Sequence, residues 1–393
     1  MHNIPAAYLL SLNPTSYGIY KNLRDTPFPL HLYHKGGGLE PLLGKDIILH
    51  RLSIEDEPEA VVHDLLQAHA ASGATPIIMA SSDYELAFME KYRKDLEPAV
   101  SLPLPSPEIS RLANNKHAFY TKMRETGIRS PRSHFLDILN SAVLPTDMRW
   151  PILIKPIHSH EWKTTVASRA IRGRKVFVIR KPEEWSSLQA TIRKFSSELL
   201  AQEIIDASED GHYSYCCYAD KSGKVLWGFV TQKILQYPEN FGTALLCRTV
   251  DRPDIETFGR RTIETVGLPG VSETEVVIDR NTGELSALEI NSRHWIQHRL
   301  STRLGVNISL LDYFYRSGQR TMVEEILSGS GPFKHVLWID DFGYLTHLAK
   351  NFFRLRRLHL PAFFKNSLEF SYMEKSRLAP FLSMLMRRLL PLR

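Results

Sequence analysis

The chain has 393 residues, 43% hydrophobic and 23% charged, which is typical of soluble globular proteins and too many residues for one compact core. No apolar run approaches the roughly 18 residues that cross a bilayer, and three cysteines cannot form a disulfide framework, so we expect a cytoplasmic protein. The net charge of +6 is uneven: residues 350–393 hold ten Lys or Arg and two Glu, so the rest of the chain carries about −2.

The first 107 residues alternate between short apolar runs and helical segments. The runs AAYLLSL, LHLYHK, DIILHRL and TPIIMASSD predict strands, and a helix is predicted after the first run, from Ile19 to Arg24. Helices between successive strands favour parallel pairing, so we predict a Rossmann-like domain over residues 1–107. Its end is marked by VSLPLPSPEIS, where three prolines stop regular structure.

The remainder of the chain divides into three further segments. Residues 108–195 predict a helix from Asn115 to Glu125 and a strand, WPILIKP, which ends in a lysine and a proline. Residues 196–318 predict mainly strands, with hairpin turns at DKSGK and DRNTGE. Residues 319–393 predict a basic helical extension.

The hairpin around DRNTGE carries an unusual set of polar side chains. Glu275 lies on its first strand, and Glu289 and Asn291 lie on its second. Alternate residues of a strand share a face, so Arg293 would continue the face that carries Glu289 and Asn291. Oxygen donors gathered at one point suit Mg²⁺, with Mn²⁺ as the alternative, although a solvated sheet face is an equally good interpretation of these residues alone. Basic residues that could pair with phosphates lie upstream: Lys116, Lys155 and Lys233.

Five motifs occur in a recognisable order. They are NNKHAFYTKMRETGIRSP, WPILIKP, AQEIID, Glu275 and EINSR. In this order they resemble the ATP-grasp superfamily, and within it the carboxylate–amine ligases with a pre-ATP-grasp domain. The resemblance covers Leu112–Ser317 well and Ala6–Ser110 loosely. It implies α/β and α+β architecture: a Rossmann-like pre-ATP-grasp domain (1–107), a small lobe (108–195), a large lobe with the metal site (196–318) and the basic helical extension (319–393).

The resemblance also implies a role for individual residues. The expected nucleotide-binding residues are Lys116 and Lys155 at the phosphates, Gln202, Glu203 and Ile205 at the adenine, and Glu209 or Asp210 at the ribose, where spacing leaves both acids open. The expected metal ligands are Glu275, Glu289 and Asn291. The expected catalytic residues are Arg293 and Lys233, with Gly242 facing an acyl phosphate. One departure is the bulky loop IHSHEWKTT after Lys155, where the family often has glycines.

The implied activity is an ATP-dependent C–N ligase that uses ATP and Mg²⁺. It would phosphorylate a small-molecule carboxylate, commonly an amino acid or peptide in this family, and an amine would then displace phosphate to form an amide. An ATP-grasp kinase, a carboxylase-type enzyme and a non-catalytic ATP-binding protein remain alternatives. The sequence names neither substrate, and it does not predict an oligomeric state.

Two features lie outside the motifs. The tail, residues 350–393, combines apolar and basic residues, so it could contact an anionic membrane surface or an acidic partner, or pack on the nucleotide-binding lobes. Nucleic acid is not expected, because no reading module is present. His294 and His298 have a spacing that can bind metal on a helix, but no third ligand is evident, so we expect substrate contact or solvent exposure.

Overall fold

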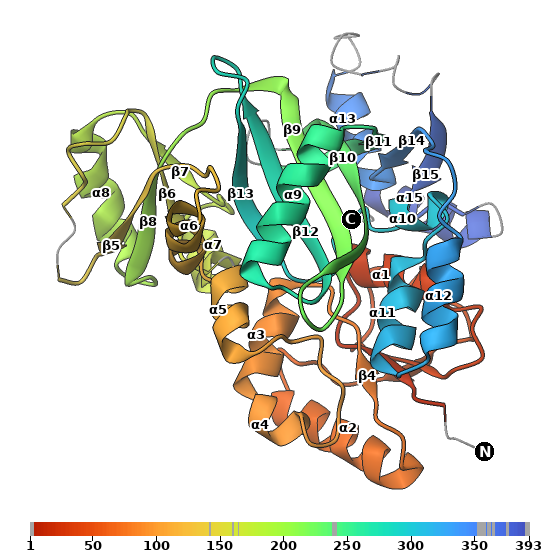
Figure 1. The fold of residues 1–393 in the computed structure, drawn as a ribbon. Coiled ribbons are helices and arrows are strands. Elements are labelled where there is room, and N and C mark those ends of the chain that lie inside the picture. Colours follow the sequence, from red (N-terminus) through yellow and green to blue (C-terminus); the bar gives the residue numbers. More distant parts are fainter. Residues whose placement is uncertain are drawn as a thin grey trace.

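Three sheets organise the computed structural model, which describes residues 4–140, 143–158, 161–163, 165–237, 242–351, 359, 363, 366–374 and 377–389. Figure 1 shows the N-terminal sheet with its helices at the bottom, the small lobe at the left and the large sheet between the small lobe and the C-terminal helices. No helix among these described residues is long and apolar enough to cross a bilayer.

The N-terminal sheet is parallel, with the strand order β3-β2-β1-β4. Its strands are β1 (Ala7–Leu9), β2 (Leu30–Tyr33), β3 (Ile48–His50) and β4 (Ile77–Ile78). Its helices are α1 (Pro14–Leu23), η1 (Glu40–Leu42), α2 (Pro58–Ser72), α3 (Asp83–Lys91) and α4 (Arg93–Leu96). Along β1, Leu9 joins the core under α1, whereas Tyr8 joins the core under α2 and α3. The predicted Rossmann-like arrangement is therefore confirmed.

Helix α1 begins earlier than the sequence pattern predicts. The side chain of Asn13 accepts hydrogen bonds from the backbone N–H groups of Thr15 and Ser16, which caps the helix before Pro14. The helix therefore includes residues 14–18, PTSYG, ahead of the predicted start at Ile19. Its first residues lie at the edge of the cleft described below.

The small lobe contains an antiparallel sheet with the order β5-β8-β6-β7. Its helices are α5 (Pro107–Asn114), α6 (Lys116–Glu125), η2 (Glu161–Lys163), α7 (Thr165–Ala170) and α8 (Pro182–Ile192). Its strands are β5 (Ser133–Asp137), β6 (Ile152–Pro156), β7 (Phe177–Ile179) and β8 (Glu198–Glu203). Strand β8 pairs with β5 and β6, so this sheet extends past residue 195, where the sequence placed the end of the small lobe. Asn115 caps α6 by accepting from the N–H of Ala118, as the predicted helix start requires.

The large sheet has seven strands in the order β13-β12-β9-β10-β11-β14-β15. The strands are β9 (Ala207–Ala219), β10 (Val225–Tyr237), β11 (Thr243–Val250), β12 (Gly270–Asp279), β13 (Leu285–Asn291), β14 (Val336–Ile339) and β15 (Ser367–Phe370). The helices are α9 (Pro253–Val266), α10 (Leu300–Arg303), α11 (Ile308–Arg316), α12 (Arg320–Ser328), α13 (Asp341–Asn351) and α15 (Leu378–Leu389). Both predicted hairpins form, between β9 and β10 and between β12 and β13.

The C-terminal segment differs from the predicted helical extension. Strands β14 and β15 pair in parallel and extend the large sheet beyond β11. After β15 the chain packs against α1: the ammonium group of buried Lys21 donates to the carbonyls of Phe370 and Ser371, and Arg24 binds Glu374. Residues 336–339 and 367–374 of the predicted extension therefore belong to the large sheet and its contacts with α1.

Candidate active site

A cleft of about 700 Å³ opens where the three sheets meet. The N-terminal domain contributes residues at the ends of two of its strands, including Asn13, Thr15 and Ser81. The small lobe contributes β6, the end of β8 and residues 173–176, and the large lobe contributes β10, β12 and β13 with the residues after β13. The predicted site residues that line this cleft are Lys116, Lys155, Gln202, Glu203, Ile205, Lys233, Gly242, Glu275, Glu289, Asn291 and Arg293.

The hairpin of β12 and β13 brings the predicted metal ligands together. Glu275 lies directly opposite Glu289 in the antiparallel register, and Asn291 lies opposite Glu273. Directly opposed side chains on one face are separated by only about 5 Å at their Cβ atoms. The two carboxylates and the amide are thus held on one rigid face, as the sequence predicted.

Arg293 reaches the site in a different way from the one predicted. Strand β13 ends at Asn291, so Arg293 lies beyond the strand and not on its face. Its guanidinium donates to Asp83 Oδ1 at 2.6 Å and to Asn291 Oδ1 at 3.1 Å. Asp83 is the first residue of α3, so the N-terminal domain helps to fix this cation in the cleft.

Each opposed carboxylate has its own lysine. Lys116 Nζ lies 3.6 Å from Glu289 Oε2, and Lys233 Nζ lies 3.7 Å from Glu275 Oε2. Burial of Glu289 opposes its charge, but Lys116 and Lys155 outweigh this and lower its pKa. Burial likewise opposes the charge of Lys233, and the carboxylates of Glu275 and Glu273 outweigh it and raise its pKa. Glu289 is therefore held as a carboxylate and Lys233 as an ammonium group.

Lys155 is the exception among the cations. Burial and the nearby charge of Lys116 lower its pKa to about 7, although Glu289 and Glu275 act in the opposite direction. Its ammonium group donates to the hydroxyl of Tyr120 at 3.1 Å. That hydroxyl also accepts from the side-chain amide of Gln202 and donates to the carbonyl of Leu288. Tyr120 thus links the phosphate end of the predicted site to its adenine end.

The predicted hinge lies at one wall of the cleft, at the end of β8. The backbone N–H of Glu203 donates to the carbonyl of Arg132 at 2.9 Å, so it is not available to an adenine. Of the two backbone groups of Glu203, the carbonyl is therefore the one that could bind the base. The two candidates for the ribose differ. Asp210 is exposed on β9 and is not among the described residues that line the cleft, whereas the side chain of Glu209 lies outside the described residues.

Several residues in the cleft were not singled out from the sequence. Glu273 is buried opposite Asn291, accepts from the amides of Asn291 and Gln297, and has a pKa raised to about 7 by burial and by Glu275. His212 lines the cleft, and burial and Lys233 lower its pKa. The position of Glu273, two residues before Glu275 on the same strand, is a pattern that could have identified it.

Two other sequence expectations have definite outcomes. His294 and His298 are buried, and each places Nδ1 against a backbone carbonyl, of Ala80 and Trp295 respectively, so neither is exposed to solvent. In the loop after Lys155, His158 contacts the carbonyl of Asn114, while His160 and the side chain of Lys163 lie outside the described residues.

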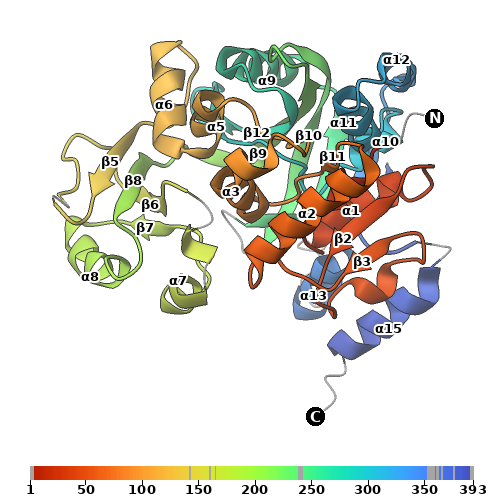
Figure 2. The ribbon, with the colours of Figure 1, turned by 90° about the horizontal axis from the view of Figure 1, so that it is seen from below.

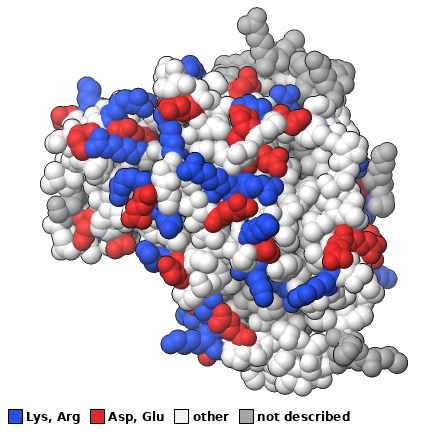
Figure 3. Space-filling view, in the orientation of Figure 1, with Lys and Arg blue, Asp and Glu red and all other residues white. Residues whose placement is uncertain are grey.

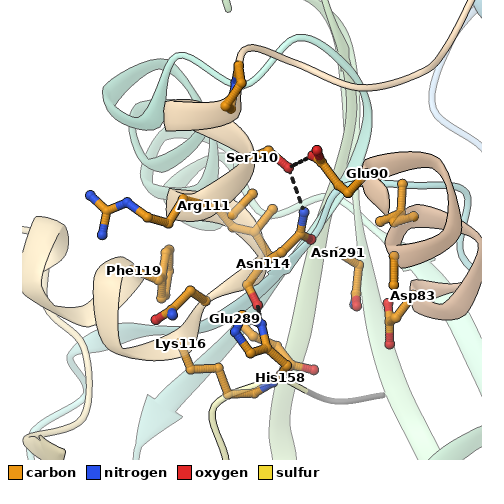
Figure 4. A pocket seen from close by; sticks show the side chains of 16 residues that line it. Asp83, Glu90, Ser110, Arg111, Asn114, Lys116, Phe119, His158, Glu289 and Asn291 are labelled. Carbon is orange, nitrogen blue, oxygen red and sulfur yellow. Dashed lines mark hydrogen bonds and ion pairs between the residues drawn. The ribbon is translucent and has the colours of Figure 1, made fainter. Parts of the chain in front are cut away.

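A smaller cavity of about 380 Å³ adjoins the cleft behind Lys116 and Glu289 (Figure 4). It lies between α3, α5, α6 and the end of β13, and shares Asp83, Lys116, Glu289 and Asn291 with the cleft. In Figure 4 the hydroxyl of Ser110 joins Glu90 and Asn114 across its upper side, while the guanidinium of Arg111 points away from the other labelled side chains. Most of the polar groups of this cavity therefore bind one another.

No protein-family model matches the sequence, and no curated protein matches it. Solved structures do match its fold. N5-carboxyaminoimidazole ribonucleotide synthetase, solved with ADP, is 10% identical and has a TM-score of 0.62, over 91% of this chain and 88% of that one. L-amino acid ligase from Bacillus licheniformis is 15% identical with a TM-score of 0.56, over 85% and 76%.

Pyruvate carboxylase from Rhizobium etli is 13% identical with a TM-score of 0.64, over 85% of this chain. This chain spans only 32% of the length of that carboxylase. At these identities the comparisons show the fold and not the reaction. The fold is shared with these ATP-grasp structures over 84% to 91% of this chain. The chain therefore has the ATP-grasp fold, preceded by a Rossmann-like domain.

Proposed function

We propose that the protein is an ATP-dependent carboxylate–amine ligase of the cytoplasm. The observation that carries this proposal is the pair of opposed carboxylates, Glu275 and Glu289, each beside a lysine in a cleft that three parts of the chain enclose. Such a site can bind a metal-bound triphosphate and neutralise charge during phosphoryl transfer. Phosphoryl transfer from ATP to a carboxylate needs no side-chain nucleophile.

The donor set fits Mg²⁺ bound together with a nucleotide. Among the described residues, no group of three or more His, Cys, Asp or Glu side chains is placed to hold a metal without further ligands. Glu275, Glu289 and the amide of Asn291 would supply part of the coordination shell, and Mg²⁺ commonly completes its shell with phosphate oxygens and water. Bound Mg·ATP would supply the phosphoryl group that activates the substrate carboxylate.

The chain's own residues would then do three things. Lys116 and Lys155 would bind the phosphates, and the end of β8 would bind the adenine. Arg293 and Lys233 would hold the substrate carboxylate and the transferred phosphoryl group in line, which reduces the entropic part of the barrier. The N-terminal wall at Ser81–Asp83 would help to exclude water from the acyl phosphate until an amine displaces phosphate.

The structural neighbours indicate which substrates to test first. One structural neighbour is an L-amino acid ligase, which supports an amino acid or short peptide as a substrate. Other neighbours are biotin carboxylases and N5-carboxyaminoimidazole synthetases, so bicarbonate has to be tested as the carboxylate. A kinase would form a phosphorylated product without an amine.

The test is ADP release from Mg·ATP with pools of carboxylates, each with and without pools of amines and with bicarbonate as a separate arm. We expect ADP release that requires one carboxylate and one amine. Release with an acceptor alone and a stable phosphorylated product would replace the ligase by a kinase. Release that requires bicarbonate would indicate a carboxylase. Tight ATP binding without ADP release in any arm would favour a non-catalytic ATP-binding protein.

A further inference from the structure

The C-terminal helix α15 has an outer face without charged residues. Leu378, Leu382 and Met386 are spaced four residues apart, which places them on one side of the helix, and each is between 44% and 52% exposed. Between them lie exposed Ala379 and Ser383. A surface helix ordinarily presents charged side chains to water, so this face is exceptional for an exposed element.

The opposite face of α15 is firmly part of the protein. Phe381 and Met384 are buried, and Phe381 stacks on Phe342 at a centroid distance of 5.1 Å. Just before the helix, Arg377 donates to the carbonyl of Leu42 at 2.9 Å. The helix is therefore docked on η1 and α13 by one face. Its exposed apolar residues form a second face, which the fold of the described residues does not bury.

The charged residues of the sequence from Lys375 onward have one sign, although Arg377 lies 3.7 Å from the carboxylate of Asp46. From Lys375 to Arg393 the sequence contains five Lys or Arg and no Asp or Glu, a net charge of +5 over 19 residues. Arg387 and Arg388 belong to the last turn of α15. On the face of the molecule in Figure 3, by contrast, Lys and Arg side chains are interspersed with Asp and Glu. An uncharged apolar face next to an unbalanced basic segment is typical of helices that lie on anionic membranes.

We propose that α15 binds an anionic lipid surface, with Leu378, Leu382 and Met386 entering the interface and the basic sequence of this segment supplying the attraction to the lipid charge. The position of α15 suits this role, because Figure 2 shows it at the periphery of the molecule, away from the small lobe. A second copy of the chain is a poorer occupant of this face, because two segments of +5 would repel each other.

The test is co-sedimentation of the full chain with vesicles of phosphatidylcholine, with and without phosphatidylserine. We expect binding that requires phosphatidylserine. It should disappear near 1 M salt, because the Debye length is then only about 3 Å and the charges no longer attract each other at longer range. Leu382→Gln with Met386→Gln should weaken partitioning about tenfold or more, because it removes apolar area from the interface. Arg387→Gln with Arg388→Gln should weaken it by a similar order, since each basic residue contributes roughly fivefold.

The matched control for the apolar change is Leu139→Gln, since Leu139 is 57% exposed on the small lobe. It should bind vesicles like the unchanged protein, and thermal unfolding should show that all variants are folded. Equal binding to both vesicle types, or unchanged binding of both double variants, would overturn the proposal. So would a dimer in sedimentation velocity that the Leu382→Gln and Met386→Gln change dissociates, because a second copy would then cover the face. None of these outcomes depends on the ligase activity.

Discussion

At the scale of single residues, the site depends on charges that hold one another in place. Glu289 lies opposite Glu275 and beside Lys116, and its pKa is lowered by Lys116 and Lys155 despite its burial. A carboxylate kept ionised in this way is a ready ligand for a hard cation. Two lysines, Lys116 and Lys155, act on this one carboxylate.

Glu289→Gln tests this assignment with minimal change of shape. We expect Mg²⁺-dependent ADP release to fall by roughly 10²-fold or more, because a neutral amide replaces a charge that would face the metal. The thermal unfolding temperature should stay close to that of the unchanged protein. Glu324→Gln, at an exposed position on α12, is the matched control and should keep full activity. Near-normal turnover of Glu289→Gln would remove the metal assignment.

Lys155 predicts a pH dependence of nucleotide binding. Its pKa is lowered to about 7 in the free protein, so above pH 7 most molecules carry it as a neutral amine. A bound phosphate favours the charged form and would raise the pKa again, so ATP binding should take up a proton and weaken as the pH rises above 7. Calorimetry in buffers of different ionisation enthalpy measures this uptake.

The control variants separate Lys155 from other titrating groups. Lys155→Arg keeps its charge over this range, so its nucleotide affinity should depend less on pH and its proton uptake should decrease. Lys224→Arg, at an exposed position before β10, should behave like the unchanged protein. Proton uptake that is identical in Lys155→Arg and the unchanged protein would assign the effect to another group.

At the scale of elements, β15 joins the end of the chain to its beginning. Glu369 on β15 is buried, accepts from Arg299 at 2.6 Å and lies 3.9 Å from Lys21 of α1. Burial and Arg299 lower the pKa of Lys21 to about 8. The contact joins three elements far apart in sequence, and it depends on one carboxylate.

Glu369→Gln should therefore destabilise the whole fold. Removal of one member of a buried charge cluster leaves the other charges uncompensated and costs roughly 3–5 kcal/mol. Urea unfolding of the full chain measures this change. Lys21→Met combined with Glu369→Gln should cost less than the sum of the two single changes, because it removes opposite charges together. Strict additivity would mean that the two groups do not interact.

The elements also show where sequence patterns stop being informative. The N-terminal strands and both hairpins were predictable because their apolar runs are bounded by clear turns. Strand β15 was not, because SLEF is short and pairs with β14 about 30 residues earlier, within a segment whose basic composition suggested a separate tail. Similarly, the spacing of His294 and His298 was considered as part of a helix, but helix α10 begins only at Leu300.

At the scale of the whole molecule, most of the site was predictable and its enclosure was not. The order of motifs identified eleven residues that line one cleft. The contact between Arg293 and Asp83 joins residues 210 positions apart, and no local pattern specifies such a pair. The same holds for Tyr120, whose hydroxyl links Lys155 and Gln202 from a neighbouring helix. Contacts between residues this far apart in sequence depend on the packing of the whole chain, so only the structure reveals them.

Different segments of the sequence line different parts of the cleft. The end formed by Lys155, Gln202 and Ile205 comes from the small lobe, whereas the opposite wall includes Asn13–Thr15 and Ser81–Asp83 from the N-terminal domain. Mutations in the N-terminal segments can therefore accumulate without changing the lysines or the opposed carboxylates. Over evolutionary time, such a protein could acquire a new substrate while its energy source stays the same, and a laboratory exchange of these two loops follows the same route.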